Sequence, residues 1–401
     1  MNNKKYKKIK FKNLEEMKKI VNNEAINTLH YIYQKIGKGI YVEIINNKLK
    51  FEPFYNLKIW NNWSNLVKVK ENTLREYFDK KTEGLKYIYQ KKHWRATNCL
   101  IQVVERNLND NYIYEFKDMF EELLKSKKIK DTYFFINTKD FPILTKNRTE
   151  PYQHLYGENV PLTSYKYPSY SKIFSQSNRL DLSEDLLIPT SDCWDLITQK
   201  EFPPKFNNNY IFKNKSPNWE DKKPIAVFRG ASTGCDTTLN DNPRLKLVKL
   251  SYKWKNDWLD VGITKEVKKS KKHISSEFLT HVNLKSLGIK LSEPISMEEQ
   301  MKYKYIFDIE GNSAAYRLGA LLQMKSVILK VESEYHIWID KYLKPMKHYI
   351  PIKRDYSNLK EILEWCHTHD DACKQIADNA YDIYKKYYNK QSIFDYLENK
   401  I

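Results

Sequence analysis

The sequence predicts an α/β protein with two domains that face a cleft. In its second half, Tyr303–Ile309 has the pattern of a strand, Ala314–Met324 that of a helix, and Val327–Lys330 that of another strand. A strand, a helix and a strand within about thirty residues make a βαβ unit, which builds parallel sheet with helices on its faces. The length of 401 residues is ample for two domains of ordinary size.

The first half of the chain is less regular. Residues 1 to about 100 are expected to be mostly helical, because apolar residues recur at helical spacing in Leu14–Ile20 and Leu74–Ile88. A strand is predicted over Thr132–Asn137. Residues 145 to 220 are rich in proline and loop-forming residues, so we expect the chain to cross between the two domains there.

The second half has clearer boundaries. Pro224–Phe228 is predicted to be a buried strand that continues directly into the turn Arg229–Gly234. Asn242 and Pro243 are the N-cap and the first residue of a predicted helix, positions that asparagine and proline favour. The remainder of the chain, from Asn358 onward, is predicted to be mainly helical.

Composition limits the function without deciding it. The chain has 69 basic and 50 acidic residues and a net charge of +19, which is compatible with a nucleic-acid partner. Only nine of the 69 basic residues are arginine, however, and the 60 lysines are spread along the whole chain. A solvated lysine-rich surface, produced by an AT-rich genome, explains the same charge. Arginine is then informative, since it should be kept where a planar guanidinium is needed.

Several classes of protein are not expected. The apolar stretches are far shorter than the roughly 20 residues that a membrane span needs. Residues 1–20 lack the apolar centre and cleavage site of a secretory signal, and the last residues match no retention tail. Five scattered cysteines give no disulfide framework. We therefore expect a cytoplasmic protein, in a reducing compartment.

Two junctions between a strand and a helix are candidate anion sites. Arg229–Gly234 offers an arginine, two hydroxyls and backbone N–H groups, and Gly311-Asn-Ser313 precedes a predicted helix with Arg317 one turn inside it. Ligands of open α/β sheets bind beyond the carboxyl ends of the strands, and these groups suit a diphosphate. Each junction alone also fits an ordinary βα turn, and neither is a P-loop or a G-x-G-x-x-G fingerprint.

Asp140 is the candidate general base, because it follows an apolar strand and is fixed by Phe141-Pro142. A turn aspartate that caps its own backbone is the alternative, and Asp192 is a similar case. The cluster from Cys366 to Cys373 has a spacing that suggests metal ligands, but its cysteines share one helical face with apolar residues. It is therefore interpreted as a buried stripe. The sequence has no Asp-x-Asp pair, so no metal or other cofactor is expected.

These motifs, taken in order, resemble glycosyltransferase family 90, whose known members are protein O-glucosyltransferases and fungal capsule xylosyltransferases. The strongest match is the string from Lys304 to Arg317, continued by Ser326–Lys330. Together the similar segments cover roughly residues 130 to 390. The other similar segments are Ile136–Pro142, Phe174-Ser175, Asp185–Asp192, Phe228–Gly230, Asn242–Arg244, Trp338, Leu343–Pro345, His348–Ile352, Asp355, Asn358-Leu359 and Ala377.

The resemblance implies the GT-B fold, with two Rossmann-like domains facing a cleft, and an inverting transfer of glucose, or a pentose such as xylose, from a UDP-sugar. The acceptor would be a hydroxyl of a glycan or protein. Asp140 would be the general base, and Asp192 and Trp194 would lie on the acceptor side. The residues implied to bind the UDP-sugar are Arg229, Ser232, Thr233, Glu310, Gly311, Asn312, Ser313 and Arg317.

The resemblance also implies a division of the chain. Residues 1–215 would form the acceptor-side domain, residues 216–380 the nucleotide-sugar domain, and residues 381–401 a C-terminal helix that packs back on the first domain. A member of the family with no signal peptide and an AT-rich gene is what a large DNA virus replicating in the cytoplasm, or a protist, would encode. The alternative function is a catalytically inactive, basic binding protein for nucleic acid or an assembly partner, although no specific nucleic acid is expected.

Overall fold

The computed structural model describes residues 10–56, 112–146, 169–180, 182–200, 202, 212, 214–234, 238–254, 258–267, 271–272, 279–280 and 282–401. The chain divides into two compact units. Unit 1 comprises Met1–Trp194, Lys200–Asn207 and Phe394–Ile401, and unit 2 comprises Asp195–Gln199 and Asn208–Ile393. Each unit contains a five-stranded sheet, so the predicted α/β class is confirmed. The helix predicted over Leu74–Ile88 lies outside the described residues.

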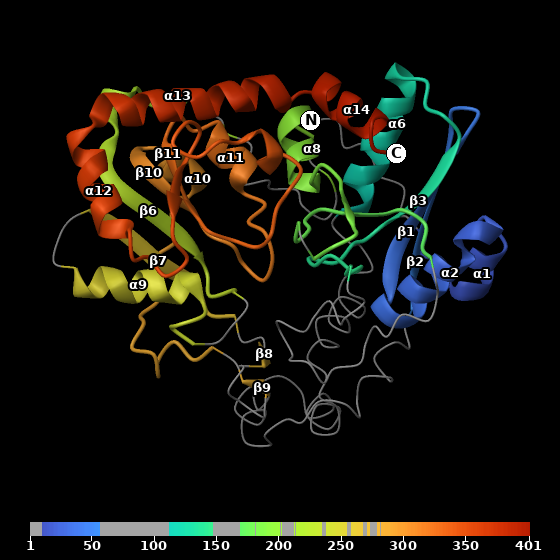
Figure 1. The fold of residues 1–401 in the computed structure, drawn as a ribbon, viewed down its shortest axis with the longest axis horizontal. Helices are drawn as coiled ribbons and strands as arrows, with labels where there is room; N and C mark the ends of the chain where they lie inside the picture. Colours follow the sequence, from blue (N-terminus) through green and yellow to red (C-terminus); the bar gives the residue numbers. More distant parts are fainter. Residues whose placement is uncertain are drawn as a thin grey trace. The chain divides into compact units, whose positions relative to one another are not determined.

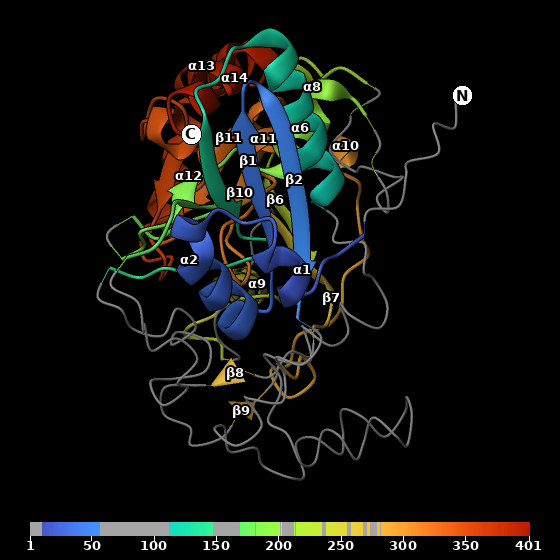
Figure 2. The same cartoon turned by 90° about the vertical axis from the view of Figure 1, so that its right-hand side faces the viewer.

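The sheet of unit 1 is mixed and has the strand order β2-β1-β3-β4-β5. β1 pairs antiparallel with β2 and β3, whereas β3, β4 and β5 run parallel. Figure 2 shows β1 and β2 side by side, with α6 next to them. The strands are β1 (Lys38–Ile45), β2 (Lys48–Tyr55), β3 (Thr132–Ile136), β4 (Ile173–Ser175) and β5 (Leu186–Leu187).

The expectation that residues 1 to about 100 are mostly helical is wrong over residues 38–55, where β1 and β2 form a hairpin. Asn46 and Asn47 form its two-residue turn with φ angles of 50° and 59°. Positive φ at both central residues matches the right-handed twist of the flanking strands, and asparagine tolerates it well. Buried β-branched residues such as Ile40, Val42 and Ile44 then fix the register.

The helices of unit 1 cover this sheet with apolar faces. α6 buries Ile113, Phe116, Met119, Phe120 and Leu123, which lie at helical spacing on one face. The helical segments are α1 (Leu14–Lys18), η1 (Asn23–Ala25), α2 (Ile26–Tyr31), η2 (Ile32–Ile36), α6 (Ile113–Ser126), α8 (Ser191–Thr198) and α14 (Lys390–Glu398). The second half of α8, from Asp195 onward, and the start of α14, up to Ile393, belong to unit 2.

The five-stranded sheet of unit 2 is entirely parallel, with the order β12-β11-β10-β6-β7. Figure 1 follows this order from β11, near α13, to β7, near α9. The strands are β6 (Lys223–Ala231), β7 (Leu259–Lys265), β10 (Tyr303–Asp308), β11 (Val327–Val331) and β12 (Ile350–Ile352). A separate short pair joins β8 (Lys271–Lys272) to β9 (Leu279–Thr280).

Crossover helices connect the parallel strands. They are α9 (Pro243–Lys253), α10 (Met297–Gln300), α11 (Leu318–Leu322) and η5 (Asp340–Tyr342). The helix η4 (Trp219–Asp221) precedes β6, and α12 (Leu359–Thr368) and α13 (Asp370–Tyr387) follow β12. The Asn242 side chain caps α9 by accepting hydrogen bonds from the backbone N–H groups of Arg244 and Leu245, as its sequence predicts. The helix predicted from Ala314 begins only at Leu318, and Arg317 is its N-cap residue.

The C-terminal cysteines belong to the core of unit 2. Cys366 and Cys373 are both fully buried and pack with Leu363 and Ile376 from α12 and α13. The burial of this cluster is therefore confirmed, but the two cysteines do not share one helical face, because the helix is interrupted at His369, which places Cys366 on α12 and Cys373 on α13. In the described part of the chain, no group of three or more histidine, cysteine or acidic side chains is arranged to hold a metal ion.

A buried lysine joins loops at the amino end of this sheet. Lys222 precedes β6, is 3% exposed, and donates to the carbonyl oxygens of Met301 and Met324. Its ammonium group also contacts the hydroxyls of Ser216 and Ser326 at 2.9 and 3.1 Å. Burial lowers the pKa of Lys222 to about 7.

Candidate functional site

Arg244 organises the carboxyl ends of β6 and β10. Its side chain lies inside unit 2, where Nε donates to the Glu310 carbonyl at 2.8 Å and Nη2 to the Ile309 carbonyl at 2.9 Å. Nη1 donates to the Ala231 carbonyl at 3.1 Å and to the Thr233 hydroxyl at 2.7 Å. All four acceptors are uncharged. These bonds hold the two loops together but leave the positive charge of the guanidinium group unbalanced.

A second guanidinium lies close to the first. Arg317 and Arg244 both contact the ring of Phe228, with guanidinium carbons 5.2 and 5.5 Å from the ring centroid. Arg317 donates to the Arg229 carbonyl at 3.0 Å. A side-chain carbon on Gly230 would come within 3.3 Å of both guanidinium groups. The same carbon would lie 2.8 Å from the Phe228 ring, so glycine is needed here mainly to leave room for that ring and, after it, for the two arginines that rest on it.

The two guanidinium groups leave a local excess of positive charge. Burial and, after it, the charge of Arg317 lower the pKa of Arg244 to about 9, so Arg244 remains charged at neutral pH. Among the described residues, no carboxylate accepts a hydrogen bond from either one. A buried cation is costly unless it is balanced. This arrangement therefore favours an anionic ligand.

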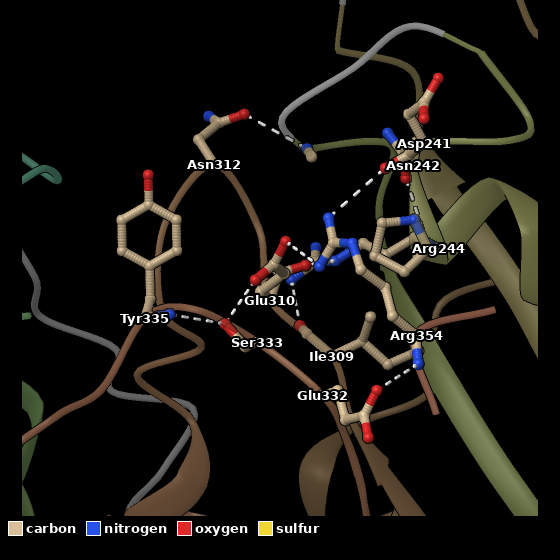
Figure 3. Close-up of polar contacts among 12 residues, drawn as sticks. Asp241, Asn242, Arg244, Ile309, Glu310, Asn312, Glu332, Ser333, Tyr335 and Arg354 are labelled. Atoms are coloured by element: carbon tan, nitrogen blue, oxygen red, sulfur yellow. Dashed lines mark hydrogen bonds and ion pairs between the residues drawn. The ribbon is translucent and has the colours of Figure 1, made fainter. Parts of the chain in front are cut away.

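Nearby carboxylates already have cations of their own. Glu310, whose side chain is 3% exposed, pairs with Arg354 at 2.6 Å and accepts a hydrogen bond from Ser333. Asp308 pairs with Lys330 at 3.2 Å. Figure 3 shows the carboxylate of Glu310 joined to Arg354 and Ser333, on the turn whose carbonyls receive Arg244. These pairs leave the excess charge with Arg244 and Arg317.

The turn after β10 approaches the turn after β6 closely. The side-chain oxygen of Asn312 accepts a hydrogen bond from the backbone N–H of Gly234 at 3.2 Å (Figure 3). A side-chain carbon on Gly311 would lie 3.2 Å from the Thr233 hydroxyl. The structure thus brings Thr233, Gly311 and Asn312, all predicted to bind the donor, to one place.

Three further predicted donor residues have structural partners. Arg229 pairs with Asp260 on β7 at 2.6 Å and donates to the Asp260 carbonyl at 2.9 Å, so its guanidinium is turned toward that strand. The Ser232 hydroxyl is buried and accepts from the backbone N–H of Val267. Ser313 is also buried, and its carbonyl accepts from the N–H of Gly311. These contacts shape the two turns.

The scarce arginines of this chain gather at one place in the described structure. Five of the nine arginines lie in the described residues, and four of these five belong to this one cluster. The sequence interpretation included Arg229 and Arg317 as ligands and Arg244 as part of a loop, but it missed Arg354. The four are Arg229, Arg244, Arg317 and Arg354.

Asp140 lies in unit 1, on the half-buried loop that follows β3. The Asn137 side chain folds over this loop: its Oδ1 accepts from the N–H of Lys139 at 2.8 Å, and its Nδ2 donates to the Phe141 carbonyl at 2.5 Å. The Ser177 hydroxyl donates to the backbone carbonyl of Asp140 at 3.2 Å. The backbone at Asp140 is therefore anchored on both sides, which suits a positioned side chain.

A second, fully buried carboxylate supports the same loop. Asp185 accepts hydrogen bonds from the backbone N–H groups of Ile143 and Leu144 at 2.9 and 2.6 Å, and from the Ser175 hydroxyl at 2.5 Å. Burial raises the pKa of Asp185 to about 6, against the effect of these three donors. Asp185 thus fixes the exit of the loop that carries Asp140.

The predicted acceptor-side residues fall in α8. Asp192 is in its first turn and is 7% exposed. Trp194 is fully buried, donates from its indole N–H to Asp118 at 2.8 Å, and packs against Phe394. A side chain with no exposed surface supports the helix, so Trp194 does not itself offer a surface to an acceptor.

Comparison with known proteins identifies the chain. Residues 110–401 match the model of the family described as Glycosyl transferase family 90. This region contains the whole cluster of arginines, the Asp140 loop and α8. The chain therefore belongs to glycosyl transferase family 90.

Its relatives include viral and animal proteins. The chain is 33% identical to Uncharacterized protein 179R of Invertebrate iridescent virus 6, over 94% of this chain and 37% of that protein. It is 29% identical to human Protein O-glucosyltransferase 3, over 69% of this chain and 49% of that protein. The chain thus spans between about a third and a half of the length of these relatives.

Among solved structures, the crystal structure of TarM has a TM-score of 0.32 and 12% identity, and the match covers 46% of this chain and 36% of TarM. The fold class accordingly rests on the two sheets described above. Within the described residues, no helix combines the length and the apolar character that a bilayer crossing requires.

Proposed function

We propose that this protein is a glycosyltransferase that moves a sugar from a UDP-sugar to a hydroxyl group of a glycan or protein, with inversion and without a metal ion. The observation that carries the proposal is the pair Arg244 and Arg317, whose hydrogen bonds to other described residues go to neutral oxygens. A nucleoside diphosphate supplies the missing negative charge at the carboxyl ends of parallel strands.

On the donor side, Arg317 is the residue proposed to contact the diphosphate directly. It is half-buried, whereas Arg244 is almost enclosed and acts mainly by holding Thr233 and the Glu310 turn in place. As the bond between sugar and phosphate breaks, negative charge grows on the leaving UDP. Fixed guanidinium groups stabilise that charge without reorganising.

On the acceptor side, Asp140 is proposed to accept the proton of the attacking hydroxyl. The oxygen then bonds to the anomeric carbon as the phosphate leaves, so the configuration inverts in one displacement. Asn137 and Asp185 hold the loop on either side of Asp140. A fixed base avoids the entropy loss of ordering a loop during the reaction.

The sugar and the acceptor are proposals by analogy. The names of the animal relatives, Protein O-glucosyltransferases, favour glucose as the sugar and a protein hydroxyl as the acceptor, and xylose is the alternative sugar. The iridovirus relatives and the lysine-rich, AT-biased composition favour a virus-encoded enzyme that acts in the cytoplasm.

The experiment is nucleotide binding by calorimetry, without added metal, followed by turnover. The ligands are UDP, UDP-glucose, UDP-xylose and GDP, and the proteins are wild type, Arg317→Met and Asp140→Asn. We expect the wild type to bind UDP and one UDP-sugar, and Arg317→Met to lose UDP binding. Asp140→Asn should still bind UDP but lose sugar transfer or donor hydrolysis. The absence of binding to every nucleotide would refute the proposal and leave salt-dependent binding of nucleic acid as the function to test.

A further inference from the structure

Arg354 follows β12 and reaches the same turn as Arg244 from the other side. Its Nη1 pairs with Oε1 of Glu310 at 2.6 Å, and its Nη2 donates to the Asp241 carbonyl at 3.4 Å. Glu310 in turn receives Arg244 through its main-chain oxygen. Figure 3 shows these contacts converging on the Glu310 turn. One residue thus anchors two guanidinium groups, which places Arg354 beside the candidate anion site.

We propose that Arg354 is a further donor-binding residue, which contacts the anionic part of the nucleotide, and that Glu310 acts by positioning Arg354. This inference rests on the donor site proposed above. It assigns Glu310 a different role from the direct contact with the UDP-sugar that the family resemblance implied.

Exposure separates the two members of the pair. The Arg354 side chain is 40% exposed, whereas that of Glu310 is 3% exposed. Glu310 has both Arg354 and the Ser333 hydroxyl on its carboxylate, so its acceptor capacity is largely used inside the protein. Arg354 is therefore the member of the pair with exposed surface. A guanidinium with five N–H donors in a fixed fork can bind a carboxylate on one edge and a phosphate on another.

The backbone of Arg354 is also fixed, because its N–H donates to the Glu332 carboxylate at 3.2 Å. Its side chain is held by Glu310 and by the Asp241 carbonyl, so little side-chain freedom remains to be lost when a ligand binds. An arginine that is held in advance gains more affinity from each hydrogen bond than a mobile surface lysine does. In a chain with only nine arginines, this placement distinguishes Arg354 from the general basic surface.

The test compares Arg354→Gln with Lys353→Gln. Lys353 is the exposed neighbour, so its variant removes the same charge one residue away. Binding of UDP and of uncharged uridine is measured by calorimetry at constant salt. We expect Arg354→Gln to weaken the affinity for UDP by about tenfold to 100-fold, which corresponds to the loss of one or two hydrogen bonds to a charged group. The affinity for uridine should be unchanged. Lys353→Gln should change UDP affinity less than about twofold.

Arg354→Lys is the second variant, because it keeps the ion pair with Glu310 and thereby guards against misfolding. It should still weaken the affinity for UDP by at least about threefold, since an ammonium group lacks the planar fork with which a guanidinium binds two partners on different edges. Equal UDP binding by wild type, Arg354→Gln and Arg354→Lys would overturn the inference while leaving the donor site intact. Failure of the wild type to bind UDP would refute the donor site and this inference together.

A double-mutant cycle tests the positioning role of Glu310. If Glu310 acts through Arg354, then Glu310→Gln weakens the affinity for UDP in the wild-type background. It should have no further effect on that affinity in the Arg354→Gln background. Additive losses in the double variant would mean that Glu310 contacts the ligand independently, which would overturn this part of the inference.

Discussion

Replacing Arg244 by methionine separates stability from ligand binding in unit 2. Methionine keeps the unbranched, flexible shape of the side chain but removes the guanidinium. The carbonyls of Ala231, Ile309 and Glu310 and the Thr233 hydroxyl then lose their donor. Since these groups connect the turns after β6 and β10, the loss falls on the scaffold of the proposed donor site.

The size of the loss follows from these contacts. A hydrogen bond from a charged group contributes about 1.5–3 kcal/mol, so four of them bound the loss at about 6–12 kcal/mol. Removing a buried cation returns several kcal/mol of desolvation free energy. We therefore expect Arg244→Met to lower the free energy of unfolding by about 3–5 kcal/mol, the range found when a buried charged partner is removed.

Chemical denaturation at pH 7, followed by the fluorescence of unit 2 tryptophans such as Trp219, measures this change. Arg317→Met is the matched control, because Arg317 is half-buried and donates to a single carbonyl. It should cost about 1 kcal/mol of stability and yet abolish UDP binding. A loss below about 1 kcal/mol in Arg244→Met would contradict the scaffold role that we assign to Arg244.

Three further predictions follow from other residues. Asp140→Asn should lower kcat about 100-fold to 10,000-fold and leave UDP affinity within twofold, whereas equal losses in both quantities would argue against a general base. Because the pKa of Asp185 is raised from 3.8 to about 6, its contribution to stability is complete below about pH 4 and is lost as pH rises through 6, a change of about 3 kcal/mol. This pH dependence should be absent from Asp185→Asn in parallel urea titrations. Because the pKa of Lys222 is lowered from 10.5 to about 7, the wild type should gain up to about 5 kcal/mol of stability between pH 7 and 10.5 relative to Lys222→Met. If the stability of the two proteins changed in parallel with pH, burial of Lys222 would not lower its pKa as stated.

The parts of this fold that follow from sequence are those with strong local signals. The strands β6, β10 and β11 are short apolar runs next to glycine or polar turns, and their predicted positions are confirmed, except that β6 continues through Ala231 where a turn was predicted from Arg229. The start of α9 is confirmed as well, because Asn242 and Pro243 satisfy the first turn by themselves. The hairpin of β1 and β2 was missed although Asn46-Asn47 is a recognisable turn, since the helical spacing of Leu14–Ile20 was extended too far.

The candidate site was only partly visible in the sequence. Its scarce arginines indicated where an anion would bind, and Arg317 remains the proposed ligand. The late start of α11 was not predictable, because Asn312 and the Glu310 turn are held by Gly234 and Arg244, residues about 65 to 80 positions earlier.

Sequence alone thus determined the family, the α/β class and the location of the two turns that we propose to bind an anion, since each depends on residues close together along the chain. Tertiary structure alone decided which arginine is a scaffold, which is paired and which faces a ligand. Arg229 is held by Asp260, Arg244 by neutral carbonyls, and Arg354 by Glu310. The charge available to a ligand is what remains after such pairing, and pairing between distant residues is set by the folded backbone.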